Sequence, residues 1–324
     1  MRRLGRGLLL GLAAVLVVAV IGLALAHFEI RGRAPELPSD AEVLALAGAA
    51  GGPAAVAWHE TAHQAMPRAR VLASSEDPDS SAPYVMSHPA FALAWPDGRL
   101  LLVDLGMERE AALAFGRPLE WAGAEPAEFA SGAAAALGPA AERAAGVVFT
   151  HLHSDHVEGL LALCAARRGA ALPVFQTAAQ AELANYTTRP GRKLVQQAGC
   201  AAPERLPDGR LAPLAGFPGV GVVDAAGHTP GSQVVLAVLG GGRRLAFTGD
   251  VANHVEGIRR NIGKPLLYRL LVVPESPQRL DRMRRWLRHL ESELGFELVV
   301  AHDQAQLATL ALPPFSTLLG PDPR

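Results

Sequence analysis

The sequence has few cysteines, few aromatic residues and no excess of charge of either sign. Cys164 and Cys200 are its only cysteines, which excludes a disulfide-rich scaffold and a zinc site built from four thiolates. Its 30 basic and 31 acidic residues give a formal net charge of −1, which argues against a strongly basic nucleic-acid-binding protein. We therefore expect no nucleic-acid partner.

Hydrophobic residues, glycine and proline are abundant instead. Hydrophobic residues make up 50% of the 324 residues, which is enough for a sizeable core and excludes an intrinsically disordered chain. The 33 glycines and 25 prolines indicate many turns and loops. The length is compatible with about two domains or with one large α/β domain.

The N-terminus carries a long uncharged run behind a basic flank. Arg2, Arg3 and Arg6 precede the run Gly7–Ala26, whose twenty residues would span about 30 Å as a helix, the thickness of the hydrocarbon core of a bilayer. We expect residues 1–26 to be an uncleaved membrane anchor. The alternative is a signal sequence cleaved after Ala24–Ala26, although the run exceeds the apolar core of a usual signal. The basic flank favours an exported remainder, or a secreted one after cleavage.

Beyond the anchor, the sequence predicts a tether and one mixed domain. Residues 27–53 contain prolines and a Gly-Ala stretch, so we interpret them as a tether, and residues 54–324 as the domain. A turn at residues 96–98 predicts a β-hairpin between residues 90–95 and 100–104. Helices are expected at residues 126–145, at 157–167 and, with leucines at helical spacing, from Pro277. Further strands are predicted at residues 146–150, 174–176, 220–224, 232–239, 244–248 and 297–301.

A histidine cluster follows directly after the apolar strand at residues 146–150. Residues 151–156 read HLHSDH, so two histidines leave the strand end at period-two spacing and an aspartate and a third histidine begin the next helix. Imidazole and carboxylate ligands suit Zn²⁺, with Fe and Mn as competitors. A surface cluster without function is hard to reconcile with an apolar strand that leads directly into it.

Residue types that bind metals recur after three other apolar strands. His228 lies in a Gly-His-Thr-Pro-Gly turn, Asp250 ends a Thr-Gly-Asp sequence, and His302 follows the last predicted strand. Each alone is weak, because a lone histidine or aspartate at a strand end is usually a loop residue. Together with the cluster they predict a metal centre at the ends of four strands.

This combination resembles the metallo-β-lactamase superfamily, whose hallmarks HxHxDH, GH, GD and a final histidine occur here in order. The early strand that ends in Asp104-Leu105-Gly106 is also similar. The resemblance implies an α/β fold: a four-layer αββα sandwich of two mixed sheets flanked by helices, with metals at one edge. It also implies two zinc ions per chain. The implied ligands are His151, His153 and His228 for the first metal, Asp155, His156 and His302 for the second, and Asp250 as a bridge.

The function that this resemblance implies is hydrolysis by a dinuclear zinc centre. A hydroxide shared by two cations would attack an ester, thioester, lactone or phosphodiester-like bond of a small molecule, and Asp155 would handle the proton. Alternative functions are β-lactam hydrolysis, persulfide oxidation at a single iron, and a non-enzymatic metal-binding sensor. The bridging Asp250 counts against lactamase activity. Quorum-signal lactonases carry a tyrosine shortly after that aspartate, whereas this sequence has none at residues 251–254, and His254 is a weak substitute.

Two weaker patterns complete the set of candidate residues. Residues 59–63 match HExxH, a metalloprotease motif on a helix, but we expect only a surface helix there because Pro67 follows and no third ligand is evident. Arg259, Arg260 and Lys264 lie in a loop expected to overhang the metals. They and Tyr186 are candidate contacts for an anionic substrate, with ordinary solvated charge as the slightly favoured alternative.

A Cys164–Cys200 disulfide is conceivable only in an exported domain.

Overall fold

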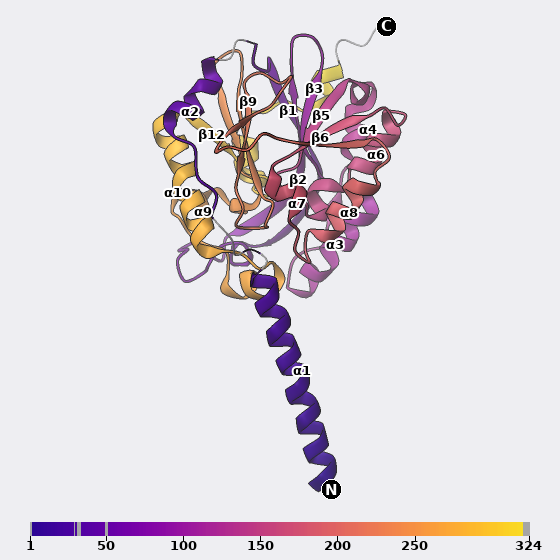
Figure 1. Ribbon diagram of the computed structural model, residues 1–324, viewed down its shortest axis with the longest axis vertical. Helices are drawn as coiled ribbons and strands as arrows, with labels where there is room; N and C mark the ends of the chain where they lie inside the picture. Colours follow the sequence, from indigo (N-terminus) through magenta and orange to yellow (C-terminus); the bar gives the residue numbers. More distant parts are fainter. Residues whose placement is uncertain (1, 29, 31–33, 49–50, 320–324) are drawn as a thin grey trace.

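A computed structural model describes residues 2–28, 30, 34–48 and 51–319. It consists of a layered body from which the helix α1 (Arg2–Phe28) projects alone (Figure 1). Residues Gly11–Phe28 of α1 have a mean hydropathy of 2.5, are almost entirely exposed, and are long and apolar enough to cross a membrane or to act as a signal sequence. The expected N-terminal apolar helix is therefore present.

The body contains two β-sheets. The first has the strand order β4-β1-β2-β3-β5-β6-β7, in which β1, β2 and β3 pair antiparallel and β3, β5, β6 and β7 pair parallel. Its strands are β1 (Ala55–Pro67), β2 (Pro83–Ala94), β3 (Leu100–Leu105), β4 (Glu128–Phe129), β5 (Ala144–Val148), β6 (Leu172–Gln176) and β7 (Ala201–Arg205).

The second sheet has the order β12-β11-β10-β9-β8 and is antiparallel except for the parallel pair β11 and β12. Its strands are β8 (Ala212–Pro213), β9 (Val220–Asp224), β10 (Gln233–Val238), β11 (Arg244–Phe247) and β12 (Phe296–Val299). Every residue of β10 is buried, as expected for a strand covered on both faces.

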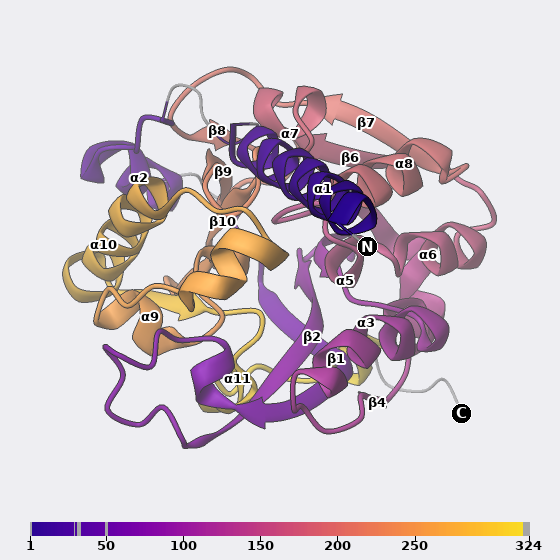
Figure 2. The same ribbon diagram turned by 90° about the horizontal axis from the view of Figure 1, so that it is seen from below.

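Helices cover the outer face of each sheet (Figure 2), where α10 and α9 lie on one side of the body and α3, α6 and α8 on the other. The helices are α2 (Asp40–Ala45), α3 (Arg109–Trp121), α4 (Ala133–Leu137), α5 (Ser154–Val157), α6 (Leu160–Ala166), α7 (Ala178–Glu182), α8 (Arg189–Gln197), α9 (Val255–Arg259), α10 (Pro277–Leu294) and α11 (Gln304–Thr309).

Three apolar clusters hold these layers together. One lies between the first sheet and its helices, one between the two sheets, where Phe91 packs edge-on against Phe247, and one between the second sheet and α10. On α10, Leu280, Leu287 and Leu290 are almost completely buried, in agreement with the leucine spacing in the sequence. The predicted four-layer αββα arrangement is confirmed.

Several local predictions are wrong, each for a physical reason. The HExxH segment is part of β1, not of a helix, because it pairs along its length with β2, and His63 contacts Glu60 with Nδ1 3.0 Å from Oε2. Residues 126–145 form β4, α4 and a 3-10 turn (Gly138–Arg143) instead of one helix, because Gly132 and Pro139 interrupt it. The helix expected at 157–167 is broken at Gly159, where a Cβ would lie 2.4 Å from the carbonyl oxygen of Leu105.

Part of the expected tether is packed against the domain. Ser39 and Glu42 form a capping box that starts α2, and Val43 and Leu46 are buried in the cluster beneath α10. Residues 29, 31–33 and 49–50 of the tether lie outside the described residues. The division into residues 1–26, 27–53 and 54–324 otherwise stays a prediction.

The structure also joins the two cysteines. Cys164 of α6 forms a disulfide with Cys200, the residue before β7, with their Cα atoms 5.3 Å apart. Both residues lie in the cluster between the first sheet and its helices. The sequence could not set this distance, because the two residues are 36 positions apart.

Candidate metal centre

Seven predicted ligands meet at one edge of the sandwich, each delivered by the segment after a strand. Four segments supply them: residues 151–156 after β5, a turn after β9, a 3-10 turn (Gly249–Val251) after β11, and the residue after Val300–Ala301 beyond β12. All seven are buried except for the half-buried His153, and they are His151, His153, Asp155, His156, His228, Asp250 and His302.

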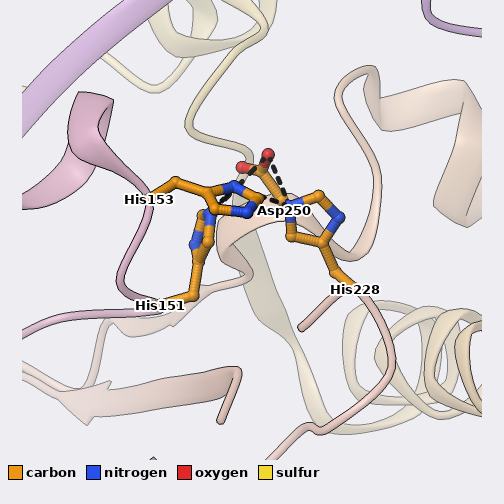
Figure 3. Close-up of side chains that lie close together, drawn as sticks. All are labelled: His151, His153, His228 and Asp250. Atoms are coloured by element: carbon orange, nitrogen blue, oxygen red, sulfur yellow. Dashed lines mark hydrogen bonds and ion pairs between the residues drawn. The ribbon is translucent and has the colours of Figure 1, made fainter. Parts of the chain in front are cut away.

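The first ligand set consists of His151, His153 and His228 (Figure 3). Nε2 of His151 lies 2.9 Å from Nδ1 of His153, which is 3.2 Å from Nε2 of His228. Three ring nitrogens thus converge on one point. Oδ2 of Asp250 faces the same point, 3.3 Å from Nε2 of His228 and 3.9 Å from Nε2 of His151.

The second ligand set consists of Asp155, His156 and His302. Oδ2 of Asp155 lies 3.7 Å from Nε2 of His156 and 3.5 Å from Nε2 of His302. The other oxygen of Asp250, Oδ1, lies 3.4 Å from His156 Nε2 and 3.0 Å from His302 Nε2. One carboxylate therefore presents one oxygen to each ligand set.

The donor atoms fit metal ions better than they fit each other. Among the described residues, Nε2 of His156 and Oδ1 of Asp250 are buried without a hydrogen bond of acceptable geometry, although their neighbours are 3.0–3.4 Å away. Buried polar atoms are rarely left unpaired, because the loss of water costs about 1–3 kcal/mol. Imidazole nitrogens and carboxylate oxygens aimed at common points are the donor set of Zn²⁺ and related divalent ions.

Electrostatics keeps the first set ready to bind a cation. Burial, and then the proximity of His156 and His153, holds the pKa of His151 well below its usual range. Burial and then His228 lower the pKa of His153 to about 3. Both rings are therefore neutral near pH 7, and neutral imidazole is the form that binds metals.

In the second set and at Asp250, neighbouring charges outweigh burial and favour the charged forms of the side chains. Burial alone would lower the pKa of His156, but Asp104 and Asp155 outweigh it and raise that pKa well above the usual value. Burial likewise opposes ionisation of Asp250, yet His302, His151 and His228 hold its pKa well below the usual range. The bridging carboxylate is therefore ionised.

Asp104 contacts a ligand of the second set on the side away from the other donors, a role that its place in the Asp-x-Gly pattern did not predict. Its Oδ2 lies 2.8 Å from Nδ1 of His156, and both of its oxygens accept hydrogen bonds from Thr150. Asp104 has a φ of +52°, a left-handed conformation that aspartate tolerates better than most residues. Its hydrogen bond to His156 fixes which ring nitrogen faces the metal site.

Glu275 and Lys264 support the first set in a similar way. Oε1 of Glu275 lies 2.6 Å from Nδ1 of His228 and 2.9 Å from Nζ of Lys264, and all three side chains are buried. Nζ of Lys264 also donates to the backbone carbonyl of Asp250. Glu275 was not predicted, since no pattern precedes the Ser276-Pro277 helix start. Lys264 was predicted as a candidate substrate contact with solvated charge as the favoured alternative, whereas its ammonium group is buried and contacts His228 and the carbonyl of Asp250.

Three other residues reach the centre without a signal in the sequence. His88 on β2 is buried, with Nδ1 3.3 Å from Oδ2 of Asp155. Oγ1 of Thr187 lies 2.8 Å from Nε2 of His153. The ring of Tyr268 lies 5.3 Å from Nζ of Lys264, and burial, and then the charges of Glu275 and Asp250, raise the pKa of its phenol well above the usual value.

The remaining predicted substrate contacts have partners elsewhere. Arg259 forms an ion pair with Glu291 on α10, and Arg260 donates to the carbonyl of Glu76. Tyr186 is 43% exposed, and its hydroxyl donates to the carbonyl of Val272. His254 accepts a hydrogen bond at the start of α9. The structure does not bring any of these four side chains into the ligand cluster.

Comparisons with known proteins agree with this geometry. The model of the metallo-beta-lactamase superfamily matches residues 85–302. Among curated protein sequences, none matches this chain. Similar solved structures include an N-acyl homoserine lactone hydrolase with the product N-hexanoyl-L-homoserine at its catalytic metal centre, at 14% identity and a TM-score of 0.60, covering 81% of this chain and 98% of that one.

Two further structures show the same fold. A quorum-quenching N-acyl homoserine lactone lactonase is 14% identical, with a TM-score of 0.55 over 81% of this chain and 97% of that one. A probable metal-dependent hydrolase from Staphylococcus aureus is 11% identical, with a TM-score of 0.52 over 78% and 91% of the two chains.

Proposed function

Because the chain belongs to the metallo-beta-lactamase superfamily and is a metal-dependent hydrolase, we propose that it uses two zinc ions to cleave an ester or lactone of a small molecule. The observation that carries two metals rather than one is the carboxylate of Asp250. Its two oxygens face separate ligand sets, each of which is complete in the described residues. A site for a single ion would not account for a second group of donors, Asp155, His156 and His302, on the other side of that carboxylate.

When bound, two such cations would supply an activated water and a Lewis acid for the bond that is cleaved. The protein residues around them have separate tasks. Asp155, with its Oδ2 close to both His302 and His88, is placed to hold the proton that is released and to pass it on. Thr187 and Glu275 orient His153 and His228 through their remote ring nitrogens.

Tyr268 is the residue that we propose contacts the substrate oxygen. Its ring lies 5.3 Å from Nζ of Lys264, which donates to the carbonyl of Asp250, and its pKa is raised, so the hydroxyl can donate a hydrogen bond to a carbonyl oxygen as negative charge develops there. Quorum-signal lactonases carry a tyrosine shortly after the bridging aspartate, and this chain has none at residues 251–254. Here Tyr268 stands 18 residues after Asp250, and its ring is near Lys264, whose Nζ donates to the backbone carbonyl of Asp250.

The choice of ester or lactone over phosphodiester is supported by the solved structures of lactone hydrolases that share the fold. Those structures show only that the fold is shared, and the choice of substrate is our proposal. We further propose that α1 is an uncleaved anchor and that the body is exported. The disulfide between Cys164 and Cys200 supports this placement, because disulfides persist in oxidising compartments.

Two measurements on the purified full chain test the function. Metal analysis should find about two zinc ions per chain, which the two ligand sets require. A panel of short water-soluble substrates should then show hydrolysis of esters and lactones above that of β-lactams and phosphodiesters. One iron per chain with persulfide-dependent oxygen uptake would replace this proposal by an oxidative one. Two metals without hydrolysis of any panel member would favour a sensor.

A further inference from the structure

The segment that carries Tyr268 exposes a dense apolar face. This segment, residues 265–272, contains the π-helical turn Tyr268–Val272 and only one charged residue, Arg269. Leu267 is 69% exposed and Leu271 is 61% exposed. Large exposed side chains are scattered on an ordinary soluble surface, and a contiguous group of them marks an interaction site. We call this group the apolar face; it consists of Leu266, Leu267, Leu270, Leu271 and Val272.

The apolar face lies beside the C-terminal end of α1, where the helix meets the body. Nε2 of His27, at the end of α1, is 3.2 Å from the carbonyl oxygen of Leu270. Figure 1 shows the short gold helical segment of the apolar face beside the upper end of α1. If α1 crosses a bilayer, the lipid surface passes through this end of the body, so the apolar face is positioned against it.

The surroundings of the apolar face have the composition of a membrane interface. A pocket next to the end of α1 is lined by Phe28, by Glu182 and by the cations Arg189, Arg192 and Lys193 of α8, so basic side chains outnumber acidic ones there, and each cation attracts anionic headgroups by about 1 kcal/mol. Trp121 at the end of α3 is 89% exposed, and tryptophan is enriched where a protein meets the headgroup region.

A second pocket lies beside the apolar face and is lined in part by its leucines. It has a volume of about 430 Å³ and is lined mainly by apolar side chains, among them Met66, Leu119 and Leu267. Tyr268 lies on its wall, and the Tyr268 ring is 5.3 Å from Nζ of Lys264, which contacts the carbonyl of Asp250. Tyr268 therefore connects the wall of the apolar pocket, through Lys264, with the backbone of Asp250.

We propose that the apolar face is immersed in the lipid surface that α1 crosses and that the pocket behind it receives the apolar chain of a bilayer-resident ester or lactone. The inference rests on the proposed hydrolase function and anchor, and it adds the substrate class and the route of entry. The headgroup end of such an amphiphile would lie beside Tyr268 and the metals, while its chain stays among Met66 and Leu119.

Immersion of the apolar face can be measured by fluorescence. The full chain is reconstituted in vesicles of phosphatidylcholine and phosphatidylglycerol in which the phosphatidylcholine carries brominated acyl chains. Tryptophan placed by Leu267→Trp should be quenched about twofold or more, because an interfacial segment lies ~5–10 Å into the acyl boundary. The signal of each added tryptophan is taken after subtraction of the wild type in the same vesicles, because Trp121 is itself expected at the interface. The matched control is Leu161→Trp on α6, which is 47% exposed and whose added signal should not be quenched. Equal quenching of the two, or none at Leu267→Trp because a second copy covers it, would overturn the proposal.

Occupation of the pocket can be measured by photolabelling in the same vesicles with a diazirine fatty acid. The wild type should be labelled on Met66 and on α1, which serves as an internal control for insertion. Ala122→Trp, which fills the pocket mouth, should lower labelling of Met66 about tenfold and leave α1 unchanged, since a chain gains about 0.8 kcal/mol per buried methylene. Labelling confined to α1 in the wild type would overturn the proposal.

Neither readout requires turnover, so the two proposals fail separately. A chain that is labelled at Met66 but inactive on short soluble esters contradicts the hydrolase assignment and supports the pocket. A chain that is active on those esters but labelled only along α1 supports the hydrolase and contradicts the membrane route.

Discussion

The two ligand sets of the centre share Asp250 but are supported from behind in different ways. In the first set, the carboxylate of Glu275 behind His228 is itself paired with Lys264 at 2.9 Å. In the second set, the carboxylate of Asp104 behind His156 accepts hydrogen bonds from Thr150, and no Lys or Arg pairs with it among the described residues.

Because of this difference, we expect Asp104 and Glu275 to affect different properties of the protein. A carboxylate that hydrogen-bonds to an imidazole raises the basicity of the ring and strengthens its bond to a metal. At Asp104 the full negative charge acts on His156, whereas Lys264 offsets much of the charge of Glu275. We therefore expect Asp104 to act mainly on metal affinity and Glu275 mainly on the stability of the fold around Asp250.

The largest effect should come from the residue common to both sets. Asp250→Ala removes one carboxylate oxygen from each ligand set at once and leaves the facing histidines without a counter-charge. We expect metal content to fall well below two per chain and kcat/KM to fall about a thousandfold or more, since Lewis-acid stabilisation contributes several kcal/mol. Metal analysis beside kinetics checks this, and retention of both metals would show that Asp250 is not a bridge.

A matched pair of substitutions separates the two sets. His153→Ala affects only the first set and His302→Ala only the second, so each should leave about one metal per chain. Loading the two variants with cobalt should then give different visible spectra, because the remaining ligands differ. If either variant loses both metals, the sets are not independent, and the comparison drawn above fails.

The third prediction concerns Glu275. Glu275→Gln leaves Lys264, which is 4% exposed, as a buried cation without its counter-charge, and we expect a loss of stability of about 3 kcal/mol. Burial would raise the pKa of Glu275, but Lys264 and His228 lower it overall. The pair therefore contributes its full stability above the ordinary glutamate pKa and loses it as pH falls through the lowered value.

The test is thermal unfolding of the detergent-solubilised full chain as a function of pH. The double variant Glu275→Gln/Lys264→Met is the control, because it removes the unpaired charge and should recover most of the stability. A double variant as unstable as the single one would show that the ion pair is not the cause.

Asp104→Asn should have a smaller effect, and on affinity rather than stability. The amide keeps the size of the side chain but not its charge, so the second metal should bind about 10–100-fold more weakly while the first is unaffected. Competition with a zinc chelator measures both constants. Equal weakening of the two metals would contradict the distinction between the sets.

The ligands were predictable from the sequence, because each follows an apolar strand and strand ends are local features. His151, His228 and His302 needed only that their strands end at one edge of the sandwich. The hydrogen bonds that Asp104 and Glu275 form with the ligand histidines were not predictable, because Asp104 and His156 are 52 positions apart and His228 and Glu275 are 47 apart. Only the fold brings such pairs together.

The same distinction explains the wrong predictions. HExxH matches a helical motif, but pairing of β1 with β2 over most of its length overrides a five-residue pattern. Arg259 was placed over the metals by its distance along the chain from Asp250, yet it closes a short helix and pairs with α10. The apolar pocket could not be predicted either, because Met66, Leu119 and Leu267 come from three distant segments.

The smallest effect is expected at His88, which approaches the second set from β2. Its Nδ1 is 3.3 Å from Oδ2 of Asp155, and its ring lies edge-on to Phe115 with centroids 5.0 Å apart. Burial lowers the pKa of His88, so the ring is neutral and its contact with Asp155 contributes about 1 kcal/mol. His88→Leu should therefore weaken the second metal by less than about tenfold. Chelator competition on His88→Leu and on the conservative variant His88→Gln checks this, and loss of the second metal in both would make His88 a ligand in its own right.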